Sequence, residues 1–279
     1  MIDALRDVFG SALKSLDVFY VLEGCKPVSR ILAKEEELQG ILDFLEDKNL
    51  KTAVSDFKVV KEPGAANSYS DKGVRLNGPS YGNNNHLVYI SKEEKLAKRA
   101  RQYEDKNDHF HLGLSLGYPE CCSEFFTKRF PVESKKKNDY TLAVLENSEN
   151  YTFPFQTNVA ARFLDVALLS HFPCSFNCRH SKAIAEKNLT AIKKHSEEWH
   201  KLLSGMLNSV VLYSEENGIF LLRNFSLDKN KVFYSTVMAS MNSEIYKQLK
   251  DAEYMEILGK NRIRLGAEVT DSFGVMVFQ

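Results

Sequence analysis

Two short segments near the middle of the chain carry its strongest pattern: LGYPECCSEFF at residues 116–126 and HFPCSFNCRHS at residues 171–181. In each segment a proline precedes a group of cysteines, and an apolar pattern of helical spacing follows them. Proline is favoured in the first turn of a helix, where its missing N–H is not needed. We therefore expect a helix to begin near each cysteine group. The same spacing predicts a helical central region, residues 93–207, with helices at about 119–130, 139–147, 157–170 and 179–206.

The residues on either side of this central region mix helical and strand patterns. In the N-terminal part, residues 1–92, Asp17–Leu22 (DVFYVL) reads as a strand and Ile31–Leu45 as a helix. In the C-terminal part, residues 208–279, Glu216-Asn217-Gly218 predicts a hairpin turn between two strands. The result is an α+β fold whose helical centre is flanked by β-containing ends. The sequence is compatible with three separate parts and equally with one continuous domain.

Composition excludes several classes of function. The chain has 279 residues and equal numbers of basic and acidic side chains, 37 of each, so no global charge attracts nucleic acid or an anionic membrane. No apolar run reaches the roughly 18–20 residues that span a bilayer. Asp3 and Asp7 interrupt the pattern of a signal peptide. We expect a soluble, cytoplasmic protein that binds neither nucleic acid nor membrane, with a small molecule as its partner.

Four of the five cysteines lie close together in the sequence, at positions 121, 122, 174 and 178. At a helix N-terminus the positive end of the dipole favours thiolate over thiol, which suits a metal ligand and equally a nucleophile. If the second segment is already helical, Cys174 and Cys178 face the same side. Cys121 and Cys122 are adjacent and diverge by about 100° on a regular helix. Both can bind one centre only if the helix begins at or after Cys121.

The cysteine and histidine side chains are compatible with several kinds of site. Four thiolates suit zinc or an iron–sulfur cluster, and two thiolates with His171 or His180 would leave room for water or substrate. The C-C and C-x₃-C spacings differ from the usual pairs of C-x₂-C. Four cysteines could also be small apolar residues in a helical core, or a reactive thiol pair without metal.

Other polar residues around the cysteines are candidates for roles in catalysis. His171 is the preferred accessory ligand or acid–base group, since it lies three residues from Cys174. Glu120 could act as a general base, although a carboxylate early in a helix also complements the dipole. Arg162 and Arg179 could hold an anionic group of a substrate or cofactor.

Two further histidines, His109 and His111, precede the first segment. They alternate in the sequence, so on extended backbone both would point to one face. There they could bind metal or transfer protons, but a solvated pair is the favoured interpretation.

The two cysteine segments resemble the paired motifs of a prokaryotic protein family of unknown function. Its members carry a G-Y-P-x-C-C block and, some fifty residues later, an H-x-P-C-x₃-C block. The resemblance covers about 65 residues and implies that the two blocks form one site, without naming an activity. A fainter similarity is to the cluster-binding modules of heterodisulfide reductases, whose later cysteines are separated by two residues instead of three.

The leading hypothesis is a metal- or iron–sulfur-dependent enzyme acting on a small molecule. Its metal ligands are Cys121, Cys122, Cys174, Cys178 and His171. His171, Glu120 and Arg179 are the candidate catalytic residues, and Arg162 is the candidate for cofactor or substrate binding. One alternative is a non-catalytic binding or assembly protein that zinc or a cluster holds together. A second is a thiol enzyme without metal.

Overall fold

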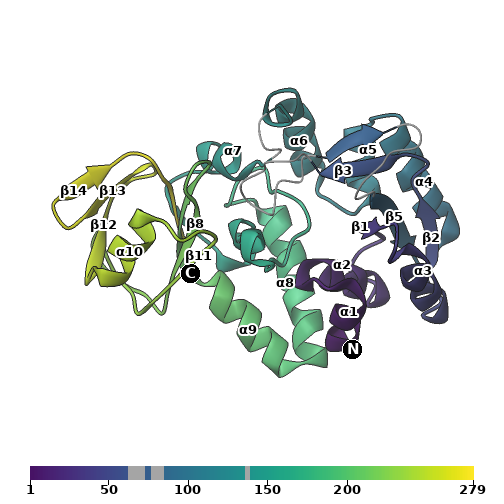
Figure 1. Cartoon of the computed structure of the whole chain (residues 1–279), viewed down its shortest axis with the longest axis horizontal. Coiled ribbons are helices and arrows are strands. Elements are labelled where there is room, and N and C mark those ends of the chain that lie inside the picture. Colours follow the sequence, from purple (N-terminus) through teal and green to yellow (C-terminus); the bar gives the residue numbers. More distant parts are fainter. Residues whose placement is uncertain (62–72, 77–84, 136–138) are drawn as a thin grey trace. The chain divides into compact units, whose positions relative to one another are not determined.

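The computed structural model describes residues 1–61, 73–76, 85–135 and 139–279 (Figure 1). Contacts divide the chain into two compact units, Met1–Asp139 and Tyr140–Gln279. Both units contain helices and sheets, which confirms the α+β class. The boundary between the units falls inside the central region 93–207. The Gly-, Asn- and Ser-rich stretch 63–85, whose composition predicts a long loop, lies largely outside the described residues.

The first unit combines an antiparallel sheet with helices. Its helices are α1 (Ile2–Phe9), α2 (Ala12–Leu22), α3 (Leu38–Asp47), α4 (Glu94–Asp105), α5 (His109–Ser115) and α6 (Glu120–Glu133). Its strands are β1 (Val28–Lys34), β2 (Lys51–Val54), β3 (Lys58–Lys61), β4 (Gly73–Leu76) and β5 (Asn85–Ser91). The sheet runs β1-β5-β3-β4, and β2 also pairs with β5. Ala97 and Ala100 of α4 pack on Val28, Ala53 and Tyr89 of this sheet.

The strand predicted at Asp17–Leu22 is wrong, because these residues form the second half of helix α2. Ser11 begins this helix by accepting a hydrogen bond from the Lys14 N–H at 3.3 Å. Residues 15–21 are all buried, including the polar Ser15 and Asp17, so this half of the helix has no exposed face. A helix buried all round has no polar face, and its short apolar run cannot be told from a buried strand by periodicity.

A buried ion pair supports the connection that leads into α6. Lys26 Nζ lies 2.5 Å from Asp17 Oδ1, and both side chains are 8% exposed. The same ammonium lies 5.2 Å from the centre of the Tyr118 ring. Gly117, just after α5, has φ +80°, and a Cβ there would lie 2.7 Å from Pro27 Cδ. The sequence Gly-Tyr-Pro is therefore required for this turn: glycine for the left-handed backbone, and proline to precede α6.

Replacing Gly117 by alanine tests this requirement. Left-handed backbone costs a residue with a Cβ about 1–2 kcal/mol, and the contact with Pro27 adds about 1–3 kcal/mol. Gly117→Ala should therefore lower the free energy of unfolding more than Gly10→Ala does. Gly10 is the matched control, since its φ is +61° and nothing lies within 4 Å of an added Cβ. Equal losses in chemical denaturation would show that Pro27 does not restrict the turn.

The second unit contains two five-stranded sheets. Its helices are α7 (Thr141–Glu146), α8 (Arg179–His195), α9 (Glu197–Leu207) and α10 (Glu244–Asp251), with 3₁₀ turns η1 (Phe155–Thr157) and η2 (Ala160–Leu164). One sheet runs β11 (Thr236–Ala239), β8 (Gly218–Arg223), β7 (Ser209–Ser214), β15 (Gly274–Phe278) and β6 (Thr152–Phe153). The other runs β14 (Glu268–Thr270), β13 (Arg262–Leu265), β12 (Tyr254–Gly259), β10 (Lys231–Phe233) and β9 (Ser226–Asp228). The predicted hairpin at 216–218 is confirmed as the β7–β8 turn.

Apolar residues from both sheets form one core in the second unit. Leu212 and Phe220 of the first sheet share this core with Met255 and Ile263 of the second, and Leu249 of α10 joins them. All five side chains are fully buried. The strands of β7, β8 and β15 are buried on both faces, which explains their continuous apolar sequences.

The helix predicted at 157–170 is wrong. The structure has the short turns η1 and η2 there, followed by irregular chain as far as Cys178. Asn158 takes part in this change, because its Nδ2 donates to the Leu207 carbonyl at 2.9 Å and its Oδ1 accepts from the Ala161 N–H at 3.2 Å. Asp165 then ends η2 with φ +60°. Polar groups that bind backbone compete with a regular helix.

The helix predicted at 179–206 is two helices, α8 and α9. Ser196 separates them in extended backbone, and its hydroxyl accepts a hydrogen bond from the Trp199 N–H at 3.2 Å.

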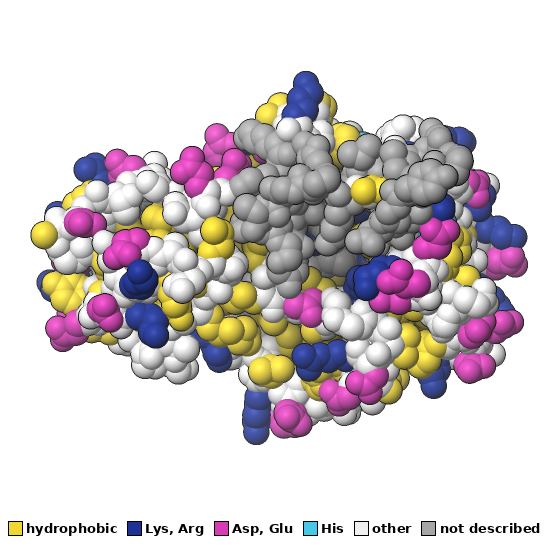
Figure 2. Space-filling model, viewed as in Figure 1, with side chains coloured by type: hydrophobic (Ala, Val, Ile, Leu, Met, Phe, Trp, Pro, Cys, Tyr) yellow, Lys and Arg dark blue, Asp and Glu magenta, His cyan; other side chains and the backbone are white. Residues whose placement is uncertain are grey.

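Charges of both signs are interspersed on the face that Figure 2 shows, as expected from the equal numbers of acidic and basic residues. Among the described helices, none has both the length and the apolar composition needed to cross a membrane.

Candidate functional site

The first cysteine pair lies in the first turn of α6. Pro119 precedes this helix, and its carbonyl accepts the N–H groups of Cys122 and Ser123 at 3.0 and 2.9 Å. The predicted helix start is thus confirmed. The helix begins one residue before Cys121, yet the sulfur atoms of Cys121 and Cys122 lie 3.9 Å apart. The two side chains therefore converge in spite of their divergent positions on the helix.

The second cysteine pair lies in the turn before α8. Cys174 is in irregular chain and Cys178 is the N-cap residue of the helix. The Cys178 N–H donates to the Ser175 carbonyl at 3.0 Å, which closes a turn around Phe176 and Asn177. The pair is thus not on one helical face, but the predicted position at a helix N-terminus is confirmed for Cys178.

The four sulfur atoms of Cys121, Cys122, Cys174 and Cys178 all lie within 4.8 Å of one another. Cys122 and Cys178 are buried, whereas Cys121 and Cys174 are partly exposed. None of the five cysteines forms a disulfide in the part of the chain that the structure describes. Four thiol groups at this spacing can bind a metal ion.

His171 is buried beside the second pair, but its ring nitrogen Nε2 lies 2.9 Å from the Ser181 hydroxyl. In the described ranges, the group of mutually close metal-binding atoms contains the four cysteines and does not include His171. Its assignment as a ligand or acid–base group stays a prediction.

The other three candidates for catalysis or binding lie at helix starts or on an aromatic ring. Glu120 and Arg179 are exposed first residues of α6 and α8. The guanidinium of Arg162 lies 4.6 Å from the centre of the Phe172 ring. Their proposed roles toward a substrate also stay predictions.

His109 and His111 are in helix α5 and not on extended backbone, so the condition under which both would point to one face is not met. The His109 ring packs on Phe130, with ring centres 4.0 Å apart. His111 Nδ1 instead lies 2.8 Å from Asp108 Oδ2 at the helix start. The Asp108 side chain caps this helix by accepting the His111 N–H. An aspartate at this position is a sequence signal for the start of a helix, and it could have indicated α5.

A charged cluster around the buried Glu104 in the first unit is not indicated by the sequence pattern. Glu104 accepts hydrogen bonds from Arg30 at 2.5 Å and from Arg75 at 2.9 Å. Burial acts to raise the pKa of Glu104, but the two guanidinium groups outweigh it and hold that pKa below its usual range. The three residues are far apart in the sequence, so no local pattern could have indicated the contact.

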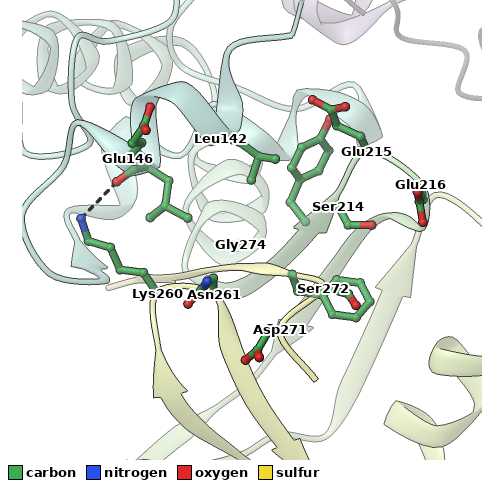
Figure 3. A pocket seen from close by; sticks show the side chains of 13 residues that line it. Leu142, Glu146, Ser214, Glu215, Glu216, Lys260, Asn261, Asp271, Ser272 and Gly274 are labelled. Carbon is green, nitrogen blue, oxygen red and sulfur yellow. Dashed lines mark hydrogen bonds between the residues drawn. The ribbon is translucent and has the colours of Figure 1, made fainter. Parts of the chain in front are cut away.

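The second unit has a hollow of about 510 Å³ on its surface (Figure 3). Carboxylates of Glu146, Glu215, Glu216 and Asp271 border it. The Lys260 ammonium at its edge donates to the Leu145 carbonyl at 3.2 Å. None of the four cysteines lines this hollow.

Comparisons with family models, curated proteins and solved structures give no match to this chain. The geometry and chemistry of the cysteine cluster are therefore the guide to function.

The half-buried ring of His109 predicts a pH dependence of stability. Burial is the main cause that lowers the pKa of His109 below its ordinary value of 6.5, and Arg30 and Arg75 lower it further against the raising effect of Glu104 and Asp108. The unfolded chain then binds more protons than the folded chain between these two pKa values. The resulting stability is complete above about pH 7.5 and is lost as the pH falls through 6.5 toward the folded-state pKa.

Chemical denaturation between about pH 7.5 and 5 measures this effect. His109→Phe should reduce the pH dependence while keeping the ring contact with Phe130. His195→Gln, an exposed position on α8, is the control and should leave the dependence unchanged. An unchanged dependence in His109→Phe would assign it to another group.

Proposed function

We propose that the chain is a metalloprotein in which Cys121, Cys122, Cys174 and Cys178 bind one zinc ion, and that this closed centre holds the cysteine segments in a binding or assembly protein. The observation that carries the proposal is the mutual distance of the four sulfur atoms, at most 4.8 Å.

The spacing favours a single ion over a cluster. A tetrahedral zinc ion with zinc–sulfur bonds of about 2.3 Å places its sulfur ligands about 3.8 Å apart. Cys121 and Cys122 are already at 3.9 Å, and the remaining pairs need to move by no more than about 1 Å to reach this spacing. An iron–sulfur cluster inserts iron and sulfide between its thiolates and holds them further apart than one ion does.

The ligand set favours a structural centre over a catalytic one. Four protein thiolates complete the coordination of zinc, whereas a catalytic zinc keeps one position for water or substrate. The negative charge of a four-thiolate zinc centre is also offset by the positive ends of α6 and α8.

A second candidate function is a reactive zinc–thiolate centre. The partial exposure of Cys121 and Cys174 favours it, since an accessible thiolate can be alkylated or oxidised. Rapid labelling of either residue by iodoacetamide in the zinc-loaded protein would support this function. Labelling no faster than that of a free-thiol control would contradict the reactive centre and support only the structural one.

Metal analysis of protein purified without oxygen tests the main proposal. We expect about one zinc per chain, and loss of nearly all of it in Cys174→Ser/Cys178→Ser and in Cys121→Ser/Cys122→Ser after dialysis against a chelator. Cys25→Ser is the matched control and should retain zinc, because Cys25 is not one of the clustered cysteines. Iron with sulfide in stoichiometric amounts, or full zinc content in both double variants, would contradict the proposal.

A further inference from the structure

The turn between Cys174 and Cys178 is fixed by hydrogen bonds and packing within the second unit. We infer that Cys174 and Cys178 are a preformed half-site that binds the metal first, and that Ser148 is the positioning residue of this half-site. The inference rests on the proposed function, since it assigns an order of binding to the same four thiolates.

Both main-chain polar groups of Phe176, in the middle of the turn, form hydrogen bonds with side chains. The Phe176 N–H donates to Ser148 Oγ at 2.8 Å, and the Phe176 carbonyl accepts from Thr157 Oγ1 at 2.7 Å. Ser148 Oγ in turn donates to the Val144 carbonyl at 2.6 Å, near the end of α7. Both hydroxyl-bearing side chains are buried, so water does not compete for these bonds.

Further contacts fix both ends of this arrangement. Asn147 Nδ2 donates to the Cys174 carbonyl at 2.7 Å. Lys260 donates to the Ser148 carbonyl, which ties the serine to the turn between β12 and β13. These bonds determine the position of the backbone that carries Cys174.

The side chain of Phe176 anchors the same turn in the core. It is fully buried, and its ring centre lies 5.0 Å from that of Phe153 on β6 and 5.2 Å from that of Phe278 on β15. The turn is thus attached to β6 and β15, and β15 is buried along its whole length. A rigid element positions ligands more accurately than a mobile loop does.

The other cysteine pair is held differently. Cys121 and Cys122 lie in the first turn of α6, where the Cys122 N–H donates to the Pro119 carbonyl at the same helix end. This helix start, like that of α8, has no side-chain cap. The ends of helices fray, so ordering this turn costs more conformational entropy at the moment of binding. The ion should therefore bind to Cys174 and Cys178 before Cys121 and Cys122 complete its coordination.

Titration of the full-length, metal-free protein with Co²⁺ tests the order. Thiolate-to-cobalt absorption increases with the number of sulfur ligands, so the spectrum reports how many thiolates bind. Cys121→Ser/Cys122→Ser should still bind one Co²⁺ with a two-thiolate spectrum. Cys174→Ser/Cys178→Ser should show no thiolate band at the same metal concentration. Equal binding by the two variants, or binding by the second alone, would overturn the inference.

Ser148→Ala, made in the Cys121→Ser/Cys122→Ser background, tests the positioning role. We expect Co²⁺ affinity to fall about tenfold or more, and Ser148→Thr, which keeps the hydroxyl, to recover most of it. Ser204→Ala is the matched control, since its buried hydroxyl has no partner among the described residues. Unchanged affinity in folded Ser148→Ala would show that the serine stabilises the fold only.

Two further measurements keep the test decisive. If Ser148→Ala does not fold, Asn147→Ala replaces it, and the same loss of Co²⁺ affinity is expected because Asn147 holds the Cys174 carbonyl. The unmutated protein is titrated in parallel. Absence of a four-thiolate spectrum there contradicts the proposed function itself, whereas a normal spectrum with wrongly ordered variants contradicts only the order of binding.

Discussion

Four sulfur atoms held within 4.8 Å of one another can all be ionised only if a cation lies among them. Two like charges about 4 Å apart repel by roughly 4 kcal/mol at the effective dielectric of a protein surface, and four thiolates contain six such pairs. A divalent ion replaces this repulsion by attraction and forms bonds to each sulfur. The helices and turns around the cysteines together place these sulfur atoms where one ion can bind them.

Each cysteine pair is positioned by a different local structure. For Cys121 and Cys122 it is the sequence Gly117-Tyr-Pro, in which a left-handed glycine against Pro27 ends α5 and a proline precedes α6. For Cys174 and Cys178 it is a turn whose central residue, Phe176, is held by Ser148 and Thr157. Both local structures place cysteines beside helix N-termini, where the helix dipole favours the thiolate form.

Features encoded by neighbouring residues could be predicted from the sequence. The start of α6, the position of Cys178 before α8 and the β7–β8 hairpin depend on proline, glycine and local spacing, and all three were predicted. Features that depend on burial or on long-range contacts could not. The pattern of Asp17–Leu22 predicts a strand, although these residues form a helix, because burial on every side leaves the helix without an exposed face.

The same limit applies to the candidate site. The four cysteines were identified from their clustering, and their close approach is confirmed. The bonds of Ser148 to Phe176 and of Glu104 to Arg30 join residues 28 and 74 positions apart, and nothing in the local sequence indicates them. The irregular chain after η1 has a similar origin, since Asn158 binds the Leu207 carbonyl from a distant helix end.

X-ray absorption spectroscopy at the metal edge measures directly whether the four cysteines bind one ion. We expect zinc with four sulfur neighbours at about 2.3 Å and no nitrogen or oxygen neighbour. Fewer than four sulfur neighbours with lighter atoms in their place, or a second metal at short distance, would contradict it.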